Sequence, residues 1–231
     1  MVTVIIPWRP QPSRLAAFEA TSRWYVENLP GAVVRTVDSG EVPFNLARCR
    51  NVGIAAVPDP DEVVVIGDAD TIPSIEPLLA AIAAAATSGL VHLPYTRYQW
   101  LGALGTAAFF DGSPLAGVDA TLVVGACSGV YVTTPRTWAS HGGQDERFRG
   151  WGFEDSAWYA AHTTLLGAVP QRHDGDVYAL HHETQLREGE QYEANAALRE
   201  RYRAAEPSPE AMRELVFGQT PEQLPNRAAA G

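Results

Sequence analysis

Short apolar runs alternate with helix-type periodicity along the first half of the 231-residue chain. Such alternation is typical of βαβ units, in which successive parallel strands are joined by helices. The runs predict strands at Val2–Ile6, Val33–Val37, Val63–Ile66 and Leu90–Leu93. The expected fold class is therefore α/β, with a mainly parallel central sheet flanked by helices.

Residues that begin and end helices set the helix boundaries in this half. Ser13 is expected to cap a helix that ends near Pro30-Gly31, and Ser74 a helix that ends at Gly89. Another helix is predicted over residues 43–57. Three helices therefore separate the four predicted strands.

The second half predicts less regular structure. Four glycines, a proline and weak periodicity predict a long loop over residues 101–118. Beyond it we expect a strand pair within 122–133, a helix from Glu154 to about Leu166, and a polar helical tail after Leu186.

Composition excludes several classes of protein. A hydrophobic fraction of 46% and a charged fraction of 19% are ordinary for a globular domain. Neither a membrane-spanning run nor a basic-then-apolar leader is apparent, so we expect a cytoplasmic protein. The net charge of -10 disfavours broad nucleic-acid binding. Cys49 and Cys127 lack metal-type spacing and are expected to be buried free thiols.

Two carboxylates, Asp68 and Asp70, directly follow the apolar run Val63–Ile66. In α/β sheets of this kind, ligands bind at the edge where the strands end. Residues two apart in an extended segment point the same way, so the pair could share a cation or divide between a cation and a ribose hydroxyl. A solvated acidic turn is the alternative interpretation.

The segment from Gly142 to Asp155 combines glycines, aromatic residues and carboxylates directly before a predicted helix. Glycines allow close approach of a ligand, and Trp151 offers a flat apolar face that suits a sugar ring. Glu154 and Asp155 stand at the helix N-terminus, where negative charge is favourable. These acids therefore either act on a ligand or only stabilise the helix.

Motif-like segments occur in a definite order along the chain. They are Ile5–Arg9 at the first strand, Phe44–Gly53 (Phe-Asn-x-Ala-x-x-x-Asn-x-Gly), Asp68-Ala69-Asp70, and Gly-Gly-x-Asp-Glu-x-Phe-x-Gly-Trp-Gly-x-Glu-Asp at 142–155. Together they resemble the GT-A glycosyltransferases of family 2, family 7 and the polypeptide N-acetylgalactosaminyltransferase type. The resemblance implies a single GT-A domain over 1–231, with a nucleotide-sugar half (1–94), an acceptor and catalytic half (95–187) and a helical tail (188–231).

The same resemblance implies a set of donor-binding residues. They are Pro7, Trp8, Arg9, Asp38, Arg48, Asn51, Asp68 and Trp151. Among these, Asp38 would hydrogen-bond the base, and Arg48 and Asn51 would face the nucleotide or the metal motif. Leu46 stands where some relatives have an arginine, which is a departure from the pattern.

Catalysis is implied for the two acids that end the last motif. Asp155 would be the general base of an inverting reaction, since a carboxylate within hydrogen-bond reach can take the acceptor's proton. Glu154 would hold a hydroxyl of the acceptor or donor sugar. Tyr95, Tyr98 and Trp100 have two interpretations: an acceptor wall or lid that orders when the donor binds, or packing on an edge strand.

A metal is the remaining implication of the resemblance. The implied ligands are Asp70, Asp68 and a histidine downstream of the last motif. For that histidine, the family's sequence pattern favours His182 over His181. Carboxylates combined with imidazole suit Mn2+, with Mg2+ as a substitute.

The predicted activity is therefore metal-dependent transfer of a hexosyl or N-acetylhexosaminyl group from a nucleotide diphosphate, expected to be a UDP-sugar, to an unidentified hydroxyl acceptor. One alternative is a nucleotidylyltransferase, which would normally carry a Gly-rich basic loop after the first strand, unlike 7–12 of this chain. The other is a catalytically silent glycan- or nucleotide-binding module.

Overall fold

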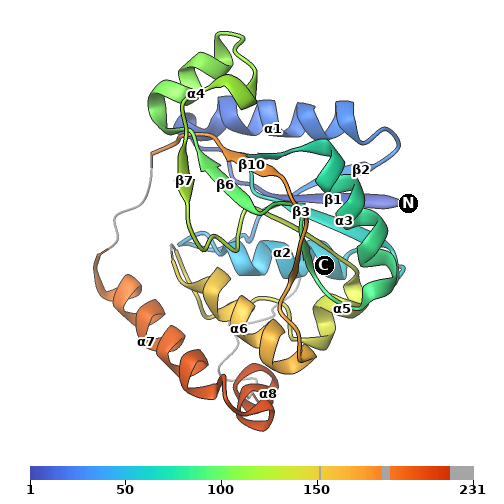
Figure 1. Ribbon diagram of the computed structural model, residues 1–231. Coiled ribbons are helices and arrows are strands. Elements are labelled where there is room, and N and C mark those ends of the chain that lie inside the picture. The colour runs from blue at the N-terminus through green and yellow to red at the C-terminus, as the bar shows by residue number, and fades with distance from the viewer. Residues whose placement is uncertain (151, 184–187, 219–231) are drawn as a thin grey trace.

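Two β-sheets form the centre of the molecule in the computed structural model, which describes residues 1–150, 152–183 and 188–218 (Figure 1). The larger sheet has the strand order β2-β1-β3-β8-β5-β9, and the smaller has the order β4-β10-β6-β7. The strands are β1 (Val2–Pro7), β2 (Val33–Val37), β3 (Val63–Gly67), β4 (Thr71–Pro73), β5 (His92–Leu93), β6 (Arg97–Trp100), β7 (Thr121–Val123), β8 (Val130–Thr133), β9 (Gln171–Arg172) and β10 (Asp176–Ala179).

Helices flank the sheets (Figure 1). Helix α4 lies near α1 at the top, whereas α6, α7 and α8 lie together at the bottom. The helices are α1 (Leu15–Asn28), α2 (Leu46–Ala55), α3 (Ile75–Ser88), α4 (Gly102–Phe110), α5 (Pro135–Ser140), α6 (Glu154–Leu166), α7 (Glu190–Ala205) and α8 (Pro209–Phe217), with short 3-10 turns η1 (Pro12–Arg14) and η2 (Leu115–Gly117).

The core of the larger sheet is the parallel set β2-β1-β3, as predicted. In the register, Ile5 of β1 lies opposite Arg35 of β2 and Ile66 of β3. Every residue of β3 is buried, because this central strand is covered on both faces of the sheet. Its β-branched side chains pack well in such a position. Beyond β3 the sheet becomes mixed, since β8 runs antiparallel to both β3 and β5.

The chain passes from the larger sheet to the smaller one at Asp68–Asp70. Strand β3 ends at Gly67, and β4 begins at Thr71. Strand β10 pairs antiparallel with β4, and the Leu180 N–H donates to the carbonyl of Asp70 at 2.8 Å. This register places the residues that follow β10 beside those that precede β4, so His182 approaches Asp70 although the two are far apart in sequence.

The predicted loop over 101–118 is wrong, because the segment contains helix α4 and the turn η2. Gly105 of this helix serves close packing, since a Cβ there would lie 2.3 Å from the Asp119 carbonyl oxygen. Leu101 and Phe109 at the two ends of this helix pack with Ala17 of α1 in an apolar cluster. A glycine count therefore predicted flexibility where the tertiary contact needs a small residue.

Other expectations for the second half also need correction. The strands within 122–133 do not pair with each other, since β7 pairs with β6 in the smaller sheet and β8 pairs with β3 and β5. Strand β6 lies between β10 and β7, so the edge-strand interpretation of Tyr98 and Trp100 is wrong. Ser13 lies within η1 and does not cap α1.

Helix α2 is shorter than predicted. It begins at Leu46 and not at residue 43, because the Asn45 side chain caps it by accepting the Arg48 N–H at 3.0 Å. Cys49 on this helix and Cys127 are buried free thiols, as expected. Within the described ranges, no helix has both the length and the apolar character needed to cross a bilayer.

Three buried histidines predict a fall in stability at low pH. Burial lowers the pKa of His92 and His162 to about 4 and that of His141 to about 3, whereas an unfolded histidine has a pKa of about 6.5. Between these values the unfolded chain binds more protons than the folded chain. These histidines therefore do not reduce the free energy of unfolding above about pH 6.5, and the free energy of unfolding decreases as the pH falls from there toward about 4.

Thermal unfolding midpoints measured between about pH 7 and about pH 4.5 check this expectation. His162→Gln is the matched variant, because glutamine can still accept the Val91 N–H that His162 Nε2 accepts at 3.1 Å. Its midpoint should depend less on pH over this range than that of the unaltered protein. Equal pH dependence of the two would contradict the assignment.

Candidate active site

The predicted carboxylates converge on one cleft of about 420 Å³. Asp68 and Asp70 reach it from the junction of the two sheets, and Glu154 and Asp155 from the N-terminus of α6. The remaining lining residues are Pro7, Gln11, Arg14, Phe44, Leu46, Ala69, Tyr98, Val123, Ala126, Ser128, Gly150, Gly152, Phe153, His182 and Glu183. The cleft therefore lies where both sheets, the start of α2 and the start of α6 meet.

A buried arginine holds Asp68. The Arg50 side chain is 0% exposed, and its guanidinium donates to Asp68 Oδ1 at 2.5 Å and to Gln144 Oε1 at 2.7 Å. Burial raises the pKa of the Asp68 carboxyl and Arg50 lowers it, with a net shift upward. Asp68 is thus held from behind by Arg50 while its exposed part faces the cleft.

Arg50→Met is expected to lower the free energy of unfolding by about 3 kcal/mol, because it leaves the largely buried Asp68 without its partner. The control is Arg35→Met on β2, where an exposed side chain makes one long hydrogen bond of 3.4 Å to Ala56. That change should cost no more than about 0.5 kcal/mol in a urea denaturation experiment. A loss in Arg50→Met no larger than in the control would contradict the expectation.

Asp70, His182 and Arg14 form a close triangle at the mouth of the cleft. Arg14 Nη2 lies 2.7 Å from Asp70 Oδ2 and 2.8 Å from His182 Nε2, and these two acceptor atoms are 2.9 Å apart. Burial raises the pKa of the Asp70 carboxyl, but His182 and Arg14 lower it by more. Asp70 is therefore ionised at neutral pH.

The protonation of His182 follows from its neighbours. Burial lowers the pKa of His182, and Asp70, whose Oδ2 lies 2.9 Å from Nε2, raises it by more. In the neutral ring with the proton on Nδ1, Nε2 carries the lone pair and accepts the Arg14 N–H at 2.8 Å, because arginine can only donate. The Nδ1–H then donates to the Glu183 carbonyl at 2.7 Å, an arrangement common for metal-binding histidines.

The pair Asp70 and His182 fits a divalent cation. Adjacent ligands of an octahedral ion with bonds of about 2.0–2.1 Å have nearly the 2.9 Å separation found here. Within the part of the chain that the structure describes, no three His, Cys, Asp or Glu side chains form a metal-binding group. A cation would take two protein ligands, and Asp68 is instead engaged by Arg50. Of the four predicted ligands, the structure brings Asp70 and His182 together.

His181 points elsewhere. Its ring packs edge-on against Trp100, with centroids 6.1 Å apart, and its backbone N–H donates to Thr106 Oγ1 at 2.8 Å. Consecutive residues after a strand diverge, and only His182 reaches Asp70 within the described residues.

The two acids of the last motif sit where α6 begins. Phe153 precedes them with a φ of 74°, a left-handed conformation that turns the chain sharply into the helix. Burial and the neighbouring Asp155 charge raise the pKa of Glu154 to about 7, and its Oε2 atom is buried with no hydrogen-bond partner among the described residues. Asp155 accepts the Ser156 N–H at 2.7 Å.

Helix α7 braces this motif. Asn195 is 1% exposed; it accepts the Arg149 N–H at 3.2 Å and donates to the carbonyls of Arg149 at 2.8 Å and Gly152 at 3.3 Å. The polar helical tail predicted from the sequence is thus part of the site's framework. Trp151, predicted to face the sugar, lies outside the described residues.

The residues after β1 differ in their placement. Pro7 lines the cleft, whereas Trp8 stacks on Phe18 of α1 with ring centroids 4.1 Å apart and is not among the lining residues. Arg9 binds Asp38 through two hydrogen bonds of 2.9 and 2.5 Å, and its guanidinium lies over the Phe44 ring, 5.2 Å from the centroid. The carboxylate of Asp38, which was predicted to bind the base, is therefore paired with Arg9.

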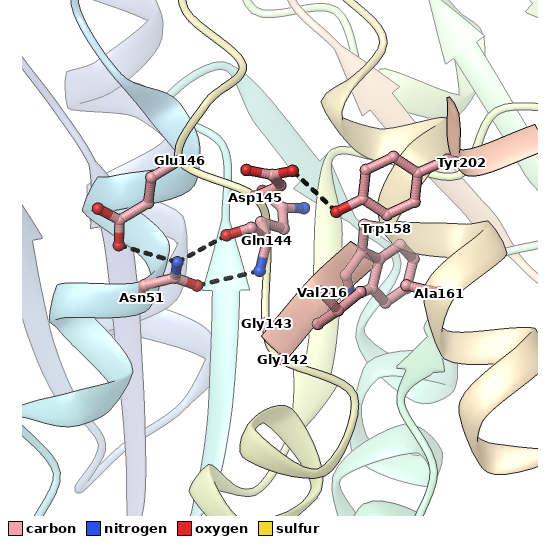
Figure 2. A pocket seen from close by; sticks show the side chains of 10 residues that line it. All are labelled: Asn51, Gly142, Gly143, Gln144, Asp145, Glu146, Trp158, Ala161, Tyr202 and Val216. Carbon is pink, nitrogen blue, oxygen red and sulfur yellow. Dashed lines mark hydrogen bonds between the residues drawn. The ribbon is translucent and has the colours of Figure 1, made fainter. Parts of the chain in front are cut away.

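Asn51 and Arg48 connect α2 to the last motif. Asn51 donates to the Gln144 carbonyl and to Glu146, and it accepts the Gln144 N–H (Figure 2). It also accepts from the Trp138 indole, so both ends of its amide are engaged by protein. Arg48 donates to Glu146 at 3.1 Å. Asn51 thus braces the last motif and lines a smaller neighbouring cavity and not the cleft, and its contact with the nucleotide or the metal motif stays a prediction.

Figure 2 shows the small cavity beside Asn51, about 160 Å³ in volume. Glycines at 142 and 143, Asp145 bonded to the Tyr202 hydroxyl, and Trp158 help to line it. None of the predicted catalytic carboxylates lines this cavity. The cavity lies where the last motif packs against α2, α6 and α7.

Sequence reasoning missed Arg14, Arg50 and Asn195. Arg50 had a signal, since it stands one residue before Asn51 in a helix directly preceding the acidic strand end. Arg14 and Asn195 had none, because the partners of Arg14 are 56 or more positions away and the motif residues that Asn195 holds are 43 or more positions away.

Several solved structures resemble this chain in fold. No family model and no curated protein matches the chain. A mutant of Drosophila β1,4-galactosyltransferase 7 in complex with manganese, UDP-Gal and xylobiose is similar at 14% identity and a TM-score of 0.51, over 74% of this chain and 63% of that one. The catalytic domain of the same Drosophila enzyme in complex with xylobiose is similar at 16% identity and a TM-score of 0.53, over 84% and 79%.

A third similar structure is GalNAc-T7 with UDP, GalNAc and Mn2+, at 8% identity and a TM-score of 0.56, over 93% of this chain and 54% of that one. The chain thus spans less than two thirds of two of these three structures. At these identities the likeness is one of fold. The chain has the GT-A fold, as predicted.

Proposed function

We propose that this GT-A chain is a metal-dependent glycosyltransferase that moves a sugar from a UDP-sugar to a hydroxyl acceptor with inversion. The supporting observation is that the Asp70–His182 pair and Asp155 line one cleft. The three similar solved structures, two of them complexes with manganese and a uridine nucleotide, agree with this choice.

The donor half of the cleft has a charged end and an apolar wall. Asp70 and His182 would hold a divalent cation, which stabilises the charge of a diphosphate as it leaves. Pro7, Phe44 and Leu46 line the cleft near the starts of η1 and α2, and an aromatic base packs well on such a surface. Asp68, fixed by Arg50, would accept a hydroxyl of the ribose or sugar.

In the proposed transfer step, Asp155 is the group that accepts the proton of the acceptor hydroxyl. The acceptor oxygen bonds to the anomeric carbon while the bond from that carbon to the diphosphate breaks, and the nucleoside diphosphate leaves with the electron pair. Asp155 takes the acceptor's hydroxyl proton, for which a carboxylate within hydrogen-bond reach is sufficient. Glu154, whose Oε2 has no partner among the described residues, would hold a sugar hydroxyl.

A screen of UDP-, GDP-, ADP- and dTDP-sugars by thermal shift, with and without Mn2+, tests the proposal. A donor at a hundred times its Kd stabilises the fold by about 2.7 kcal/mol, so a UDP-sugar should raise the Tm only when Mn2+ is present. UDP release from the best donor then separates an enzyme from a silent binding module. Stabilisation by a nucleoside triphosphate, with pyrophosphate release, would favour the nucleotidylyltransferase instead.

A further inference from the structure

One nitrogen of Arg14 contacts both atoms that would bind the cation. Arg14 Nη2 donates to Asp70 Oδ2 at 2.7 Å and to His182 Nε2 at 2.8 Å. The residue belongs to η1, the turn after β1, and its side chain is 29% exposed at the cleft. A guanidinium thus stands where a divalent ion would be.

Arg14 and a cation cannot bind His182 Nε2 at the same time. The imidazole offers one lone pair at Nε2, because its Nδ1–H donates to the Glu183 carbonyl. A lone pair that accepts an N–H is not available to a metal. Positive charges a few ångströms apart also repel each other, even when partly exposed to solvent.

Arg14 is also the one Arg or Lys among the described residues that line the cleft. The sequence contains no lysine, and the net charge is -10, so a diphosphate has few protein cations to meet. Arg14 Nε is buried and has no hydrogen-bond partner in the described part of the chain. The planar guanidinium suits phosphate oxygens, which it can bind through two N–H groups.

We propose that Arg14 is a resident counter-ion of the cation site. It holds Asp70 and His182 in place while the site has no cation, is displaced when a cation binds, and then donates to the diphosphate of the donor. The donor part of this inference rests on the proposed function. It follows that Mn2+ and UDP each raise the affinity for the other, because the diphosphate provides Arg14 with a new partner.

Titration with Mn2+, followed by the electron paramagnetic resonance of the free ion, tests the inference in the presence and absence of UDP. In Arg14→Gln, Mn2+ affinity without nucleotide should rise at least about tenfold, because a competing charge-assisted donor is removed. Calorimetry at saturating Mn2+ should show UDP affinity falling about tenfold or more, because a charged contact to phosphate is lost. A residue that only supports the fold would weaken both ligands.

Arg14→Ala should change the two affinities in the same opposite directions, and thermal unfolding establishes that each variant is folded. Arg136→Gln is the control: this exposed arginine pairs with Asp61, so both affinities should stay unchanged. Unchanged or weaker Mn2+ binding in folded Arg14 variants would overturn the inference and leave the proposed function intact.

The failure of the proposed function has a different signature. Tighter Mn2+ binding in Arg14→Gln, together with no UDP binding to any form, would support the counter-ion role and remove the sugar-nucleotide assignment. No Mn2+ binding by any form, with or without UDP, would overturn both.

Discussion

Asp155→Asn is expected to reduce sugar transfer by about 10²–10⁴-fold and to leave donor binding unchanged. An amide has nearly the shape of a carboxylate but does not take a proton at neutral pH. Asp155 lines the cleft at the start of α6 and accepts the N–H of the adjacent Ser156, a contact that an amide oxygen can also make, so the substitution should disturb the fold little. Product formation measured at saturating donor, with UDP-sugar affinity measured by calorimetry, separates the two effects.

The matched control is Asp174→Asn, an exposed carboxylate that pairs with Arg97 and does not line the cleft. It should keep full transfer activity. If Asp155→Asn turned over at the same rate as this control, the proton would have to go elsewhere. Glu154, with its raised pKa of about 7, would then be the next residue to test.

Asp70→Ala is expected to abolish Mn2+-dependent donor binding. Asp70 is 6% exposed and is the anionic member of the pair with His182, so its loss leaves Arg14 and an imidazole without a negative charge. Buried or partly buried charges that lose their partner are costly, and a cation would lose the anionic one of its two proposed ligands. Calorimetric titration of a UDP-sugar, with and without Mn2+, should give two equal and weak affinities.

Asp61→Ala provides the comparison, because that carboxylate pairs with Arg136 on the surface and does not line the cleft. It should retain the full effect of Mn2+ on donor affinity. His182→Ala should resemble Asp70→Ala in this assay, whereas His181→Ala should resemble the control, since the His181 ring packs on Trp100. Undiminished Mn2+ dependence in Asp70→Ala would remove the cation site from this position.

Local patterns were sufficient for the elements that bear the chemistry. The apolar run before Asp68 predicted β3, the acids at 154 and 155 predicted the start of α6, and Gly89 ended α3 in a left-handed conformation as expected. Each of these depends on neighbours a few positions away, which is the range over which periodicity and capping operate. The ordered motifs then predicted the GT-A fold.

Local patterns misjudged features that depend on distant contacts. Helix α4 was predicted as a loop, because the packing of its Gly105 against the Asp119 carbonyl is a contact that periodicity does not reveal. The smaller sheet was not expected, because its strands are short and come from four separate regions of the chain. Asn51 was expected at the nucleotide, yet Gln144 and Glu146, more than ninety positions away, engage its amide.

The residue types, their order and their local elements can thus be read from the chain, because backbone propensity and side-chain periodicity act between near neighbours. The partnership of Asp70 with His182 and Arg14 cannot, because it arises where β4 pairs with β10 and where η1 folds back over the sheet end. The Arg14–Asp70 hydrogen bond and the Asp70–His182 contact join residues 56 and 112 positions apart and depend on that packing. The packing alone therefore decides that a guanidinium stands at the point predicted for a metal.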